Sequence, residues 1–346
     1  MPISSSLGES YQRVKRQTAQ RINDFLARRP HRSFQRTRRR DYVRSLQLPG
    51  YIAFTHHVNQ TIWQYRPHLI GVAIVYSVLT LVLIGLGSQD TYQTLFDTLQ
   101  ETGGELFAGN WGQLGQAGVL FASIASSGLT GELTEAQQIY STLLVLLVWL
   151  TTVWLIRHLL AGHKVSLRDG LYSAGSPIVA TFIVSLVMAV QLLPLALAVI
   201  GYAAASASGL LAGGIEAMLF WMAAGLLTIL SLYWLISTFF ALVIVTLPGM
   251  YPFRALRAAG DLVIGRRLRI LLRWLWMMFV LTVTWAFVLI PIIFLDAGVK
   301  QWWPAIEWLP IVPTTLLLLG TISVIWSAVY VYLLYRKVVE DDAQPA

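Results

Sequence analysis

The chain is organised as long runs of apolar residues separated by shorter segments in which apolar residues recur at helical spacing. Six runs reach about 20 residues, the length that a helix rising about 1.5 Å per residue needs to cross the roughly 30 Å core of a bilayer. They lie near residues 68–87, 139–160, 177–203, 217–247, 270–295 and 309–335. The pattern predicts an all-α fold, a polytopic transmembrane bundle of about six helices.

A short amphipathic segment precedes each odd-numbered run. Each segment is too short and too polar to cross a membrane, so its expected place is the headgroup layer. The apolar positions are Phe54, Val58, Ile62 and Tyr65 in the first segment, Leu167, Leu171 and Ala174 in the second, and Phe253, Leu256, Gly260 and Val263 in the third. In the second segment, Ser166 and Asp169 have the spacing of a capping box. We therefore expect three helical hairpins, each preceded by a cytoplasmic interfacial elbow helix.

Composition places the chain in lipid rather than in water. Hydrophobic residues make up 56% of it, charged residues 12%, and the mean hydropathy is +0.63. These values lie outside the range of soluble domains. Cysteine is absent, which excludes disulfides, thiolate metal sites and a cysteine nucleophile.

The basic residues predict the orientation of the chain, because Lys and Arg favour the cytoplasmic side of short loops. With six spans, 24 of the 25 Lys and Arg residues fall on one side, and only Lys300 falls on the other. We therefore predict a multi-pass protein of the bacterial plasma (inner) membrane with both termini in the cytoplasm. Nucleic acid is disfavoured as a partner despite the net charge of +8, because few aromatic residues are interleaved with the basic ones.

Two segments are predicted to lie outside the membrane domain, and one long loop is predicted within it. Residues 1–47 form a basic cytoplasmic segment that we expect to be partly disordered, and residues 338–346 form a cytoplasmic tail. The membrane domain covers residues 48–337 and includes a long outer loop at 88–138. Loops of that length are usually functional or disordered. Its apolar stretch 117–129 is too short to cross the membrane and either dips into the outer leaflet or packs as a surface loop.

Anionic lipid headgroups on the cytoplasmic side are the predicted partners. Basic clusters beside a membrane helix attract such lipids by about 1 kcal/mol per residue. The candidate contacts in the third elbow helix and its link to the next span are Arg254, Arg257, Arg266, Arg267 and Arg269. Another membrane protein or a second copy of the chain is the other expected partner.

No residue pattern predicts catalysis, a metal site or a cofactor. All six histidines fall on the predicted cytoplasmic side, without the H-E-x-x-H motif or the paired spacing of membrane metal enzymes. Walker A, Rossmann and G-x-S-x-G motifs are also absent from the sequence. Ionisable residues are nearly missing from the spans, which disfavours a proton-coupled carrier.

Polar residues inside the third and fourth spans leave a second function open, a transporter or channel for a small neutral solute. Its candidate lining is Thr181, Ser185, Gln191, Thr228 and Ser231. A polar cavity between these spans would favour that function, whereas a solid bundle would favour a scaffold.

Residues 251–273 (YPFRALRAAGDLVIGRRLRILLR) carry a recognisable pattern. The proline-led amphipathic stretch, then a glycine followed by Arg and the next span, resembles the bacterial polytopic family named for the membrane domain of glycerophosphoryl diester phosphodiesterases. The resemblance covers the six-span layout from about residue 48 to 337. It implies no catalysis in this chain, because the chemistry of such fusions belongs to a separate soluble barrel. His31 and Arg32 are followed by Ser33 where the enzyme's motif has Gly, so no catalytic residue is carried over.

These features together predict a non-enzymatic integral plasma-membrane protein. We expect an envelope-associated scaffold or accessory factor that contacts lipids or a membrane partner.

Overall fold

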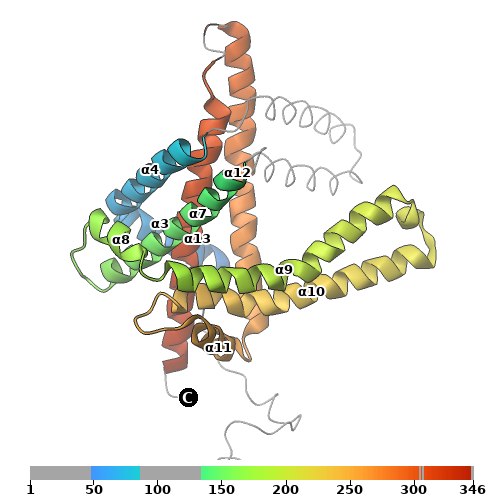
Figure 1. Ribbon diagram of the computed structural model, residues 1–346, viewed down its shortest axis with the longest axis horizontal. Helices are drawn as coiled ribbons and strands as arrows, with labels where there is room; N and C mark the ends of the chain where they lie inside the picture. Colours follow the sequence, from blue (N-terminus) through green and yellow to red (C-terminus); the bar gives the residue numbers. More distant parts are fainter. Residues whose placement is uncertain (1–47, 86–133, 304, 306–307, 344–346) are drawn as a thin grey trace, which may run out of the picture. The chain divides into compact units, whose positions relative to one another are not determined.

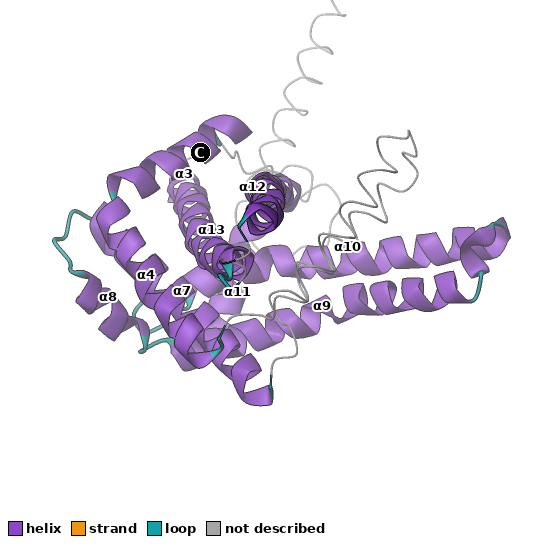
Figure 2. Ribbon diagram, turned by 90° about the horizontal axis from the view of Figure 1, so that it is seen from above, coloured by secondary structure: helices purple, strands orange, loops and turns teal. Residues whose placement is uncertain are grey.

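Six helices are long and apolar enough to cross a membrane. They are α4 (Arg66–Leu83), α7 (Glu135–Leu160), α9 (Ile178–Ala207), α10 (Gly214–Ile244), α12 (Arg267–Trp302) and α13 (Ile311–Ala343). The computed structural model describes residues 48–85, 134–303, 305 and 308–343, and within them it contains no strand (Figure 2). The predicted all-α fold with six long apolar helices is confirmed.

A short helix precedes each odd-numbered long helix. These are α3 (Tyr51–Gln64), α8 (Leu167–Ala174) and α11 (Pro252–Val263). Figure 1 shows α9 running beside α10 and α12 beside α13 as hairpins. A 3-10 turn, η2 (Leu210–Ala212), connects α9 to α10. The predicted order of short helix, long helix, connection and long helix therefore occurs three times, while the location of the short helices in a membrane interface stays a prediction.

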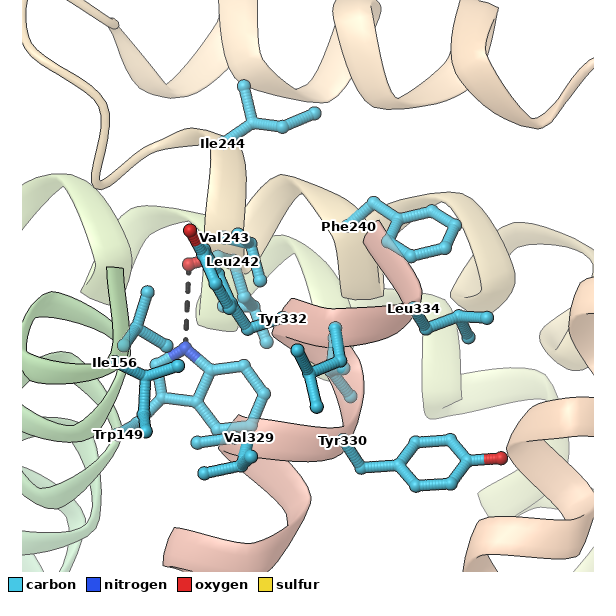
Figure 3. Close-up of a cluster of buried hydrophobic side chains, with 14 of the residues drawn as sticks. Trp149, Ile156, Phe240, Leu242, Val243, Ile244, Val329, Tyr330, Tyr332 and Leu334 are labelled. Atoms are coloured by element: carbon cyan, nitrogen blue, oxygen red, sulfur yellow. Dashed lines mark hydrogen bonds between the residues drawn. The ribbon is translucent and has the colours of Figure 1, made fainter. Parts of the chain in front are cut away.

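The main buried core lies where α7, α10 and α13 meet (Figure 3). The indole N–H of Trp149 on α7 donates to the carbonyl of Leu242 on α10 at 3.4 Å. Tyr330 on α13 is fully buried in the same core. On α4, the hydroxyl of Tyr76 pairs with that of Thr151 on α7 at 2.8 Å. The second, fourth and sixth long helices thus supply the centre of the fold.

Most apolar side chains of α9 and α12 point outward instead of into this core. A helix that is hydrophobic all round belongs inside a large core or in a membrane, so lipid is the expected surroundings of these two helices. Where α12 leaves the main core, a second small cluster joins it to α13. That cluster consists of Leu289, Ile293, Val312, Leu316 and Leu319.

The short helices bury the predicted faces with one exception. Phe54 and Val58 of α3 are fully buried, and the ring of Phe54 meets that of Tyr330 edge to face at 4.9 Å. In α11, Phe253 of the predicted apolar face is 74% exposed, and its predicted burial in the membrane interface stays a prediction. The buried stripe of α11 is instead Ala255, Ala259 and Val263, because small side chains allow this helix to approach its neighbours closely.

Candidate membrane-surface site

Hydrogen bonds join the helix ends that carry the basic residues. The Tyr65 hydroxyl, at the end of α3, donates to the carbonyl of Leu159 near the end of α7 at 3.3 Å. The His68 ring, in the first turn of α4, donates through Nε2 to the carbonyl of Val165 ahead of α8 at 3.1 Å. Both bonds connect residues more than 90 positions apart. The first bond therefore closes the basic end of the first hairpin, and the second joins that hairpin to the segment ahead of α8.

Arg157 extends this connection to the end of α10. Its guanidinium donates to the carbonyl of Thr246 at 2.9 Å, one residue beyond the helix cap at Val245. The last carbonyls of a helix have no partner within the helix and carry partial negative charge. A guanidinium placed there satisfies an otherwise unpaired acceptor.

Arg273 joins the third hairpin, α12 and α13, to the start of α3 ahead of the first hairpin. Its side chain is buried, with 6% exposed, and it donates to the carbonyls of Gly50, at 3.2 Å, and Pro49. Its guanidinium carbon also lies 4.3 Å from the centre of the Tyr51 ring. The hydroxyl of Tyr330 donates to the backbone carbonyl of Arg273 at 3.1 Å. The start of α3 is therefore fixed against α12 and α13 by one arginine.

Two of the five predicted lipid contacts are engaged inside the protein. Arg266 is buried and donates to the carbonyl of Val338 on α13 at 3.2 Å. Arg267 donates to the carbonyl of Tyr233 at 3.2 Å and lies 3.8 Å from the centre of its ring. Burial corrects the prediction for Arg266, because a side chain that is only 3% exposed holds helices together and does not face lipid.

The other three predicted lipid contacts, Arg254, Arg257 and Arg269, are exposed. On α11, Arg254 and Arg257 lie on the side of the helix away from the buried stripe of Ala255, Ala259 and Val263. Their charges are available to ligands outside the protein, and a guanidinium group binds phosphates and carboxylates in two-pronged geometry.

The predicted capping box at the start of α8 is present. The Ser166 hydroxyl accepts from the backbone N–H of Asp169 at 3.3 Å, and an Asp169 carboxylate oxygen accepts from the Ser166 N–H at 2.9 Å and its hydroxyl at 2.7 Å. These hydrogen bonds hold the pKa of the Asp169 carboxyl below its usual value. The carboxylate therefore stabilises the start of α8, and the nearby positive charge of Arg168 also favours its ionised form.

The opposite helix ends have contacts of their own. The side-chain amide of Gln137, in the first turn of α7, donates to the carbonyl of Ile84 at the end of α4 at 2.7 Å. Near the end of α12, Lys300 pairs with Asp296 at 2.9 Å. The Gln137–Ile84 bond thus joins two helix ends that the charge bias assigned to the same side. The side of the membrane that each set occupies stays a prediction.

Single-cysteine labelling can test that orientation, because the chain has no cysteine of its own. We expect a membrane-impermeant maleimide to label Ser208→Cys and Trp303→Cys in intact cells. It should label His163→Cys and Arg257→Cys only after the membrane is opened, since the basic ends are predicted to be cytoplasmic. One pair with the reverse behaviour would refute the six-span orientation.

Two members of the predicted polar lining form hydrogen bonds between α9 and α10. Gln191 accepts from the Thr238 hydroxyl at 2.6 Å, and Ser231 accepts from the backbone N–H of Leu195 at 3.0 Å. Leu195 follows Pro194, a proline inside α9. Ser231 therefore gives the Leu195 N–H an acceptor at the point where the proline interrupts the helix. The hydroxyls of Thr181 and Thr228 each donate to the backbone carbonyl four residues earlier in the chain.

The remaining member, Ser185, is half-buried. None of the five lines the open groove of about 620 Å³ that lies between the start of α7 and the start of α9. The lining of that groove is Glu135, Gln138, Ile139, Thr142, Leu143, Ile178, Val179 and Phe182. Its walls are mainly apolar, which suits lipid chains better than a hydrated solute.

The described histidines show no arrangement for metal binding. The ring of His158 stacks on Trp154 with centroids 4.0 Å apart, and its Nδ1 donates to the Trp154 carbonyl at 2.9 Å. The His163 ring lies 6.0 Å from it. Within the described ranges, no three His, Cys, Asp or Glu side chains could hold a metal ion together. His31, the basic segment 1–47, most of the outer loop 88–138 and the end of the tail lie outside those ranges.

These helices define the class of the protein, a multi-pass integral membrane protein. No family model matches the chain, and neither the curated proteins nor the solved structures contain a significant match to it. The resemblance of residues 251–273 therefore stays an expectation.

The sequence did not reveal that Arg157, Arg266 and Arg273 act as internal donors. One signal for two of them was present, since Arg157 and Arg273 are each flanked on both sides by apolar and aromatic residues. An arginine in such surroundings needs partners within the protein or must reach a headgroup.

Proposed function

We propose that the protein is a non-enzymatic scaffold or accessory factor of the plasma membrane that engages anionic lipid headgroups through its basic helix ends. It acts by presenting a fixed, positively charged surface to lipid, and no chemical step is assigned to it. The same surface is available to an acidic membrane partner, but lipid is the ligand that a membrane supplies at the highest concentration.

The observation that carries this proposal is that some arginines bond within the protein while others nearby are exposed. Arg157, Arg266 and Arg273 lock the helix ends together. Arg254 and Arg257 on α11 are left exposed beside them. The locked arginines make the surface rigid, and a rigid charged surface binds headgroups without first losing conformational entropy.

The test is the double variant Arg254→Gln/Arg257→Gln. Each charge near the surface contributes about 1 kcal/mol to the attraction of anionic lipid, so the apparent affinity should fall by at least about tenfold. Lipid titration followed by native mass spectrometry of the purified protein measures this. Helix content should be unchanged, because both side chains are exposed.

A matched control removes two charges that are already paired. Arg336 and Lys337 bond to Glu340 at 3.1 and 2.8 Å, so Arg336→Gln/Lys337→Gln should change lipid affinity much less. Equal losses in the two variants would mean that overall charge, and not the α11 surface, attracts the lipid. No loss in either would leave the α11 arginines with a topological role only.

The contacts of two residues in the predicted polar lining do not favour the solute-transport alternative. Gln191 and Ser231 bond to Thr238 and to the backbone of Leu195 within the pair of helices α9 and α10.

A further inference from the structure

Each short helix carries one large aromatic ring that no part of the described protein covers. Trp63 on α3 is 70% exposed, Tyr172 on α8 is 90% exposed and Phe253 on α11 is 74% exposed. In each helix the ring lies on the side away from the residues that pack against the long helices. An exposed aromatic side chain in water leaves a large apolar area unburied, so three such rings, one on each short helix, indicate a surface that is covered in use.

An arginine accompanies each of the three rings. The guanidinium of Arg66 lies 5.0 Å from the centre of the Trp63 ring. Arg168 precedes Tyr172 by four residues and Arg257 follows Phe253 by four, a spacing that puts the two side chains of each pair on one face of a helix. The aromatic–arginine pairs are therefore Trp63 with Arg66, Tyr172 with Arg168, and Phe253 with Arg257.

The pairs belong to helix ends that are fastened together. The Tyr65–Leu159 and His68–Val165 bonds join the ends of α3 and α7 and the starts of α4 and α8. Arg157 reaches the segment between α10 and α11. Aromatic rings favour the level of the headgroups in a bilayer, and arginines beside them contact lipid phosphates. Asp169, beside Arg168 in the chain, directs its carboxylate to Ser166, and Arg168 itself is exposed.

We propose that the three aromatic–arginine pairs are equivalent anchors in one headgroup layer, and that each binds one anionic phospholipid. The ring enters the boundary between headgroups and acyl chains, while the guanidinium binds the phosphate. The inference rests on the proposed lipid contact of α11 and extends it to α3 and α8, so that the protein holds three lipids on one face.

The first experiment measures depth. Spin labels on Trp63→Cys, Tyr172→Cys and Phe253→Cys, each in the cysteine-free chain, are examined in vesicles of phosphatidylethanolamine and phosphatidylglycerol. All three should show the same depth, at the headgroup boundary, by their accessibility to oxygen and to a water-soluble nickel complex. A label at His57, an exposed position on a different face of α3, should face water. Three labels at clearly different depths would overturn the common layer.

The second experiment removes single charges that the α11 proposal does not use. Arg66→Gln and Arg168→Gln should each lower the apparent affinity for phosphatidylglycerol by about fivefold, and the triple variant Trp63→Ala/Tyr172→Ala/Phe253→Ala should retain fewer than three lipids by native mass spectrometry. The matched control is Trp302→Ala/Trp303→Ala/Trp308→Ala, which removes three exposed rings from the other end of the last hairpin and should leave the count unchanged.

The outcomes separate the two proposals. If only the Arg254 and Arg257 variant loses lipid, the three-anchor inference fails while the proposed function stands. If Arg66→Gln and Arg168→Gln lose lipid and the α11 variant does not, the anchors on α3 and α8 are supported and the equivalence with α11 fails. If none of the variants loses lipid, both proposals fail.

Discussion

Replacing Arg273 by Lys should destabilise the protein by roughly 2–4 kcal/mol although the positive charge is kept. Lysine has a single ammonium group and no planar surface, so it cannot donate to both Pro49 and Gly50 while resting on the Tyr51 ring. A lost hydrogen bond from a charged group costs about 1.5–3 kcal/mol, and a lost cation–π contact about 0.5–2 kcal/mol. The measurement is the apparent Tm in detergent, which we expect to fall by about 5 °C or more.

Arg254→Lys is the matched control, because Arg254 is an exposed arginine on α11, the helix that precedes α12. It should leave the Tm within about 1 °C of the wild type, as surface substitutions usually do. If Arg273→Lys were as stable as the wild type, the charge of Arg273 would be all that matters, and its role would be limited to fixing orientation. Limited proteolysis ahead of α3 gives a second readout, since an undocked α3 exposes the backbone near Pro49.

Gly170→Ala should also be strongly destabilising, although it adds only one methyl group. A Cβ at this position would lie 2.8 to 3.2 Å from three side-chain carbons of Leu155, which is itself fully buried on α7. Neither side chain can give way without moving α8 off α7. Inserting a methyl group into such a contact costs about 1–3 kcal/mol, measured again as a fall in Tm.

Two further variants isolate that contact. Gly260→Ala adds the same methyl group on α11, where nothing lies within 4 Å, and it should be neutral or slightly stabilising because Ala is the better helix former. Leu155→Ala is expected to be destabilising alone, but to cost less in the Gly170→Ala background than in the wild type. Additive losses would show that the two residues do not share one contact.

Local features of the fold were readable from the sequence, and long-range ones were not. The capping box of Ser166 and Asp169 was predicted from a spacing of three residues and is present, as is the buried face of α3 at Phe54 and Val58. Both depend only on neighbours along the chain. Arg273, in contrast, bonds to Gly50 across 223 positions, and no periodicity within a helix can indicate such a partner.

Phe253 shows a different limit of pattern reading. Ranking residues by hydrophobicity places Phe253 ahead of Ala255 and Ala259 as a core residue, yet the two alanines are buried and the phenylalanine is exposed. Close helix packing selects small side chains, and in a membrane protein the most apolar residue can face lipid. The sequence also could not show which arginines of the candidate site face outward. Arg254 and Arg257 are exposed, whereas Arg266 is buried.

The bond from Arg273 to the residues before α3 also bears on the order of synthesis. Chains fold from the N-terminus as they emerge, but the partner of Gly50 is made 223 residues later. The start of α3 therefore cannot make this bond until the ribosome has produced the beginning of α12. Nascent chains halted before residue 273 should keep the segment ahead of α3 open to protease, and chains long enough to expose Arg273 should protect it.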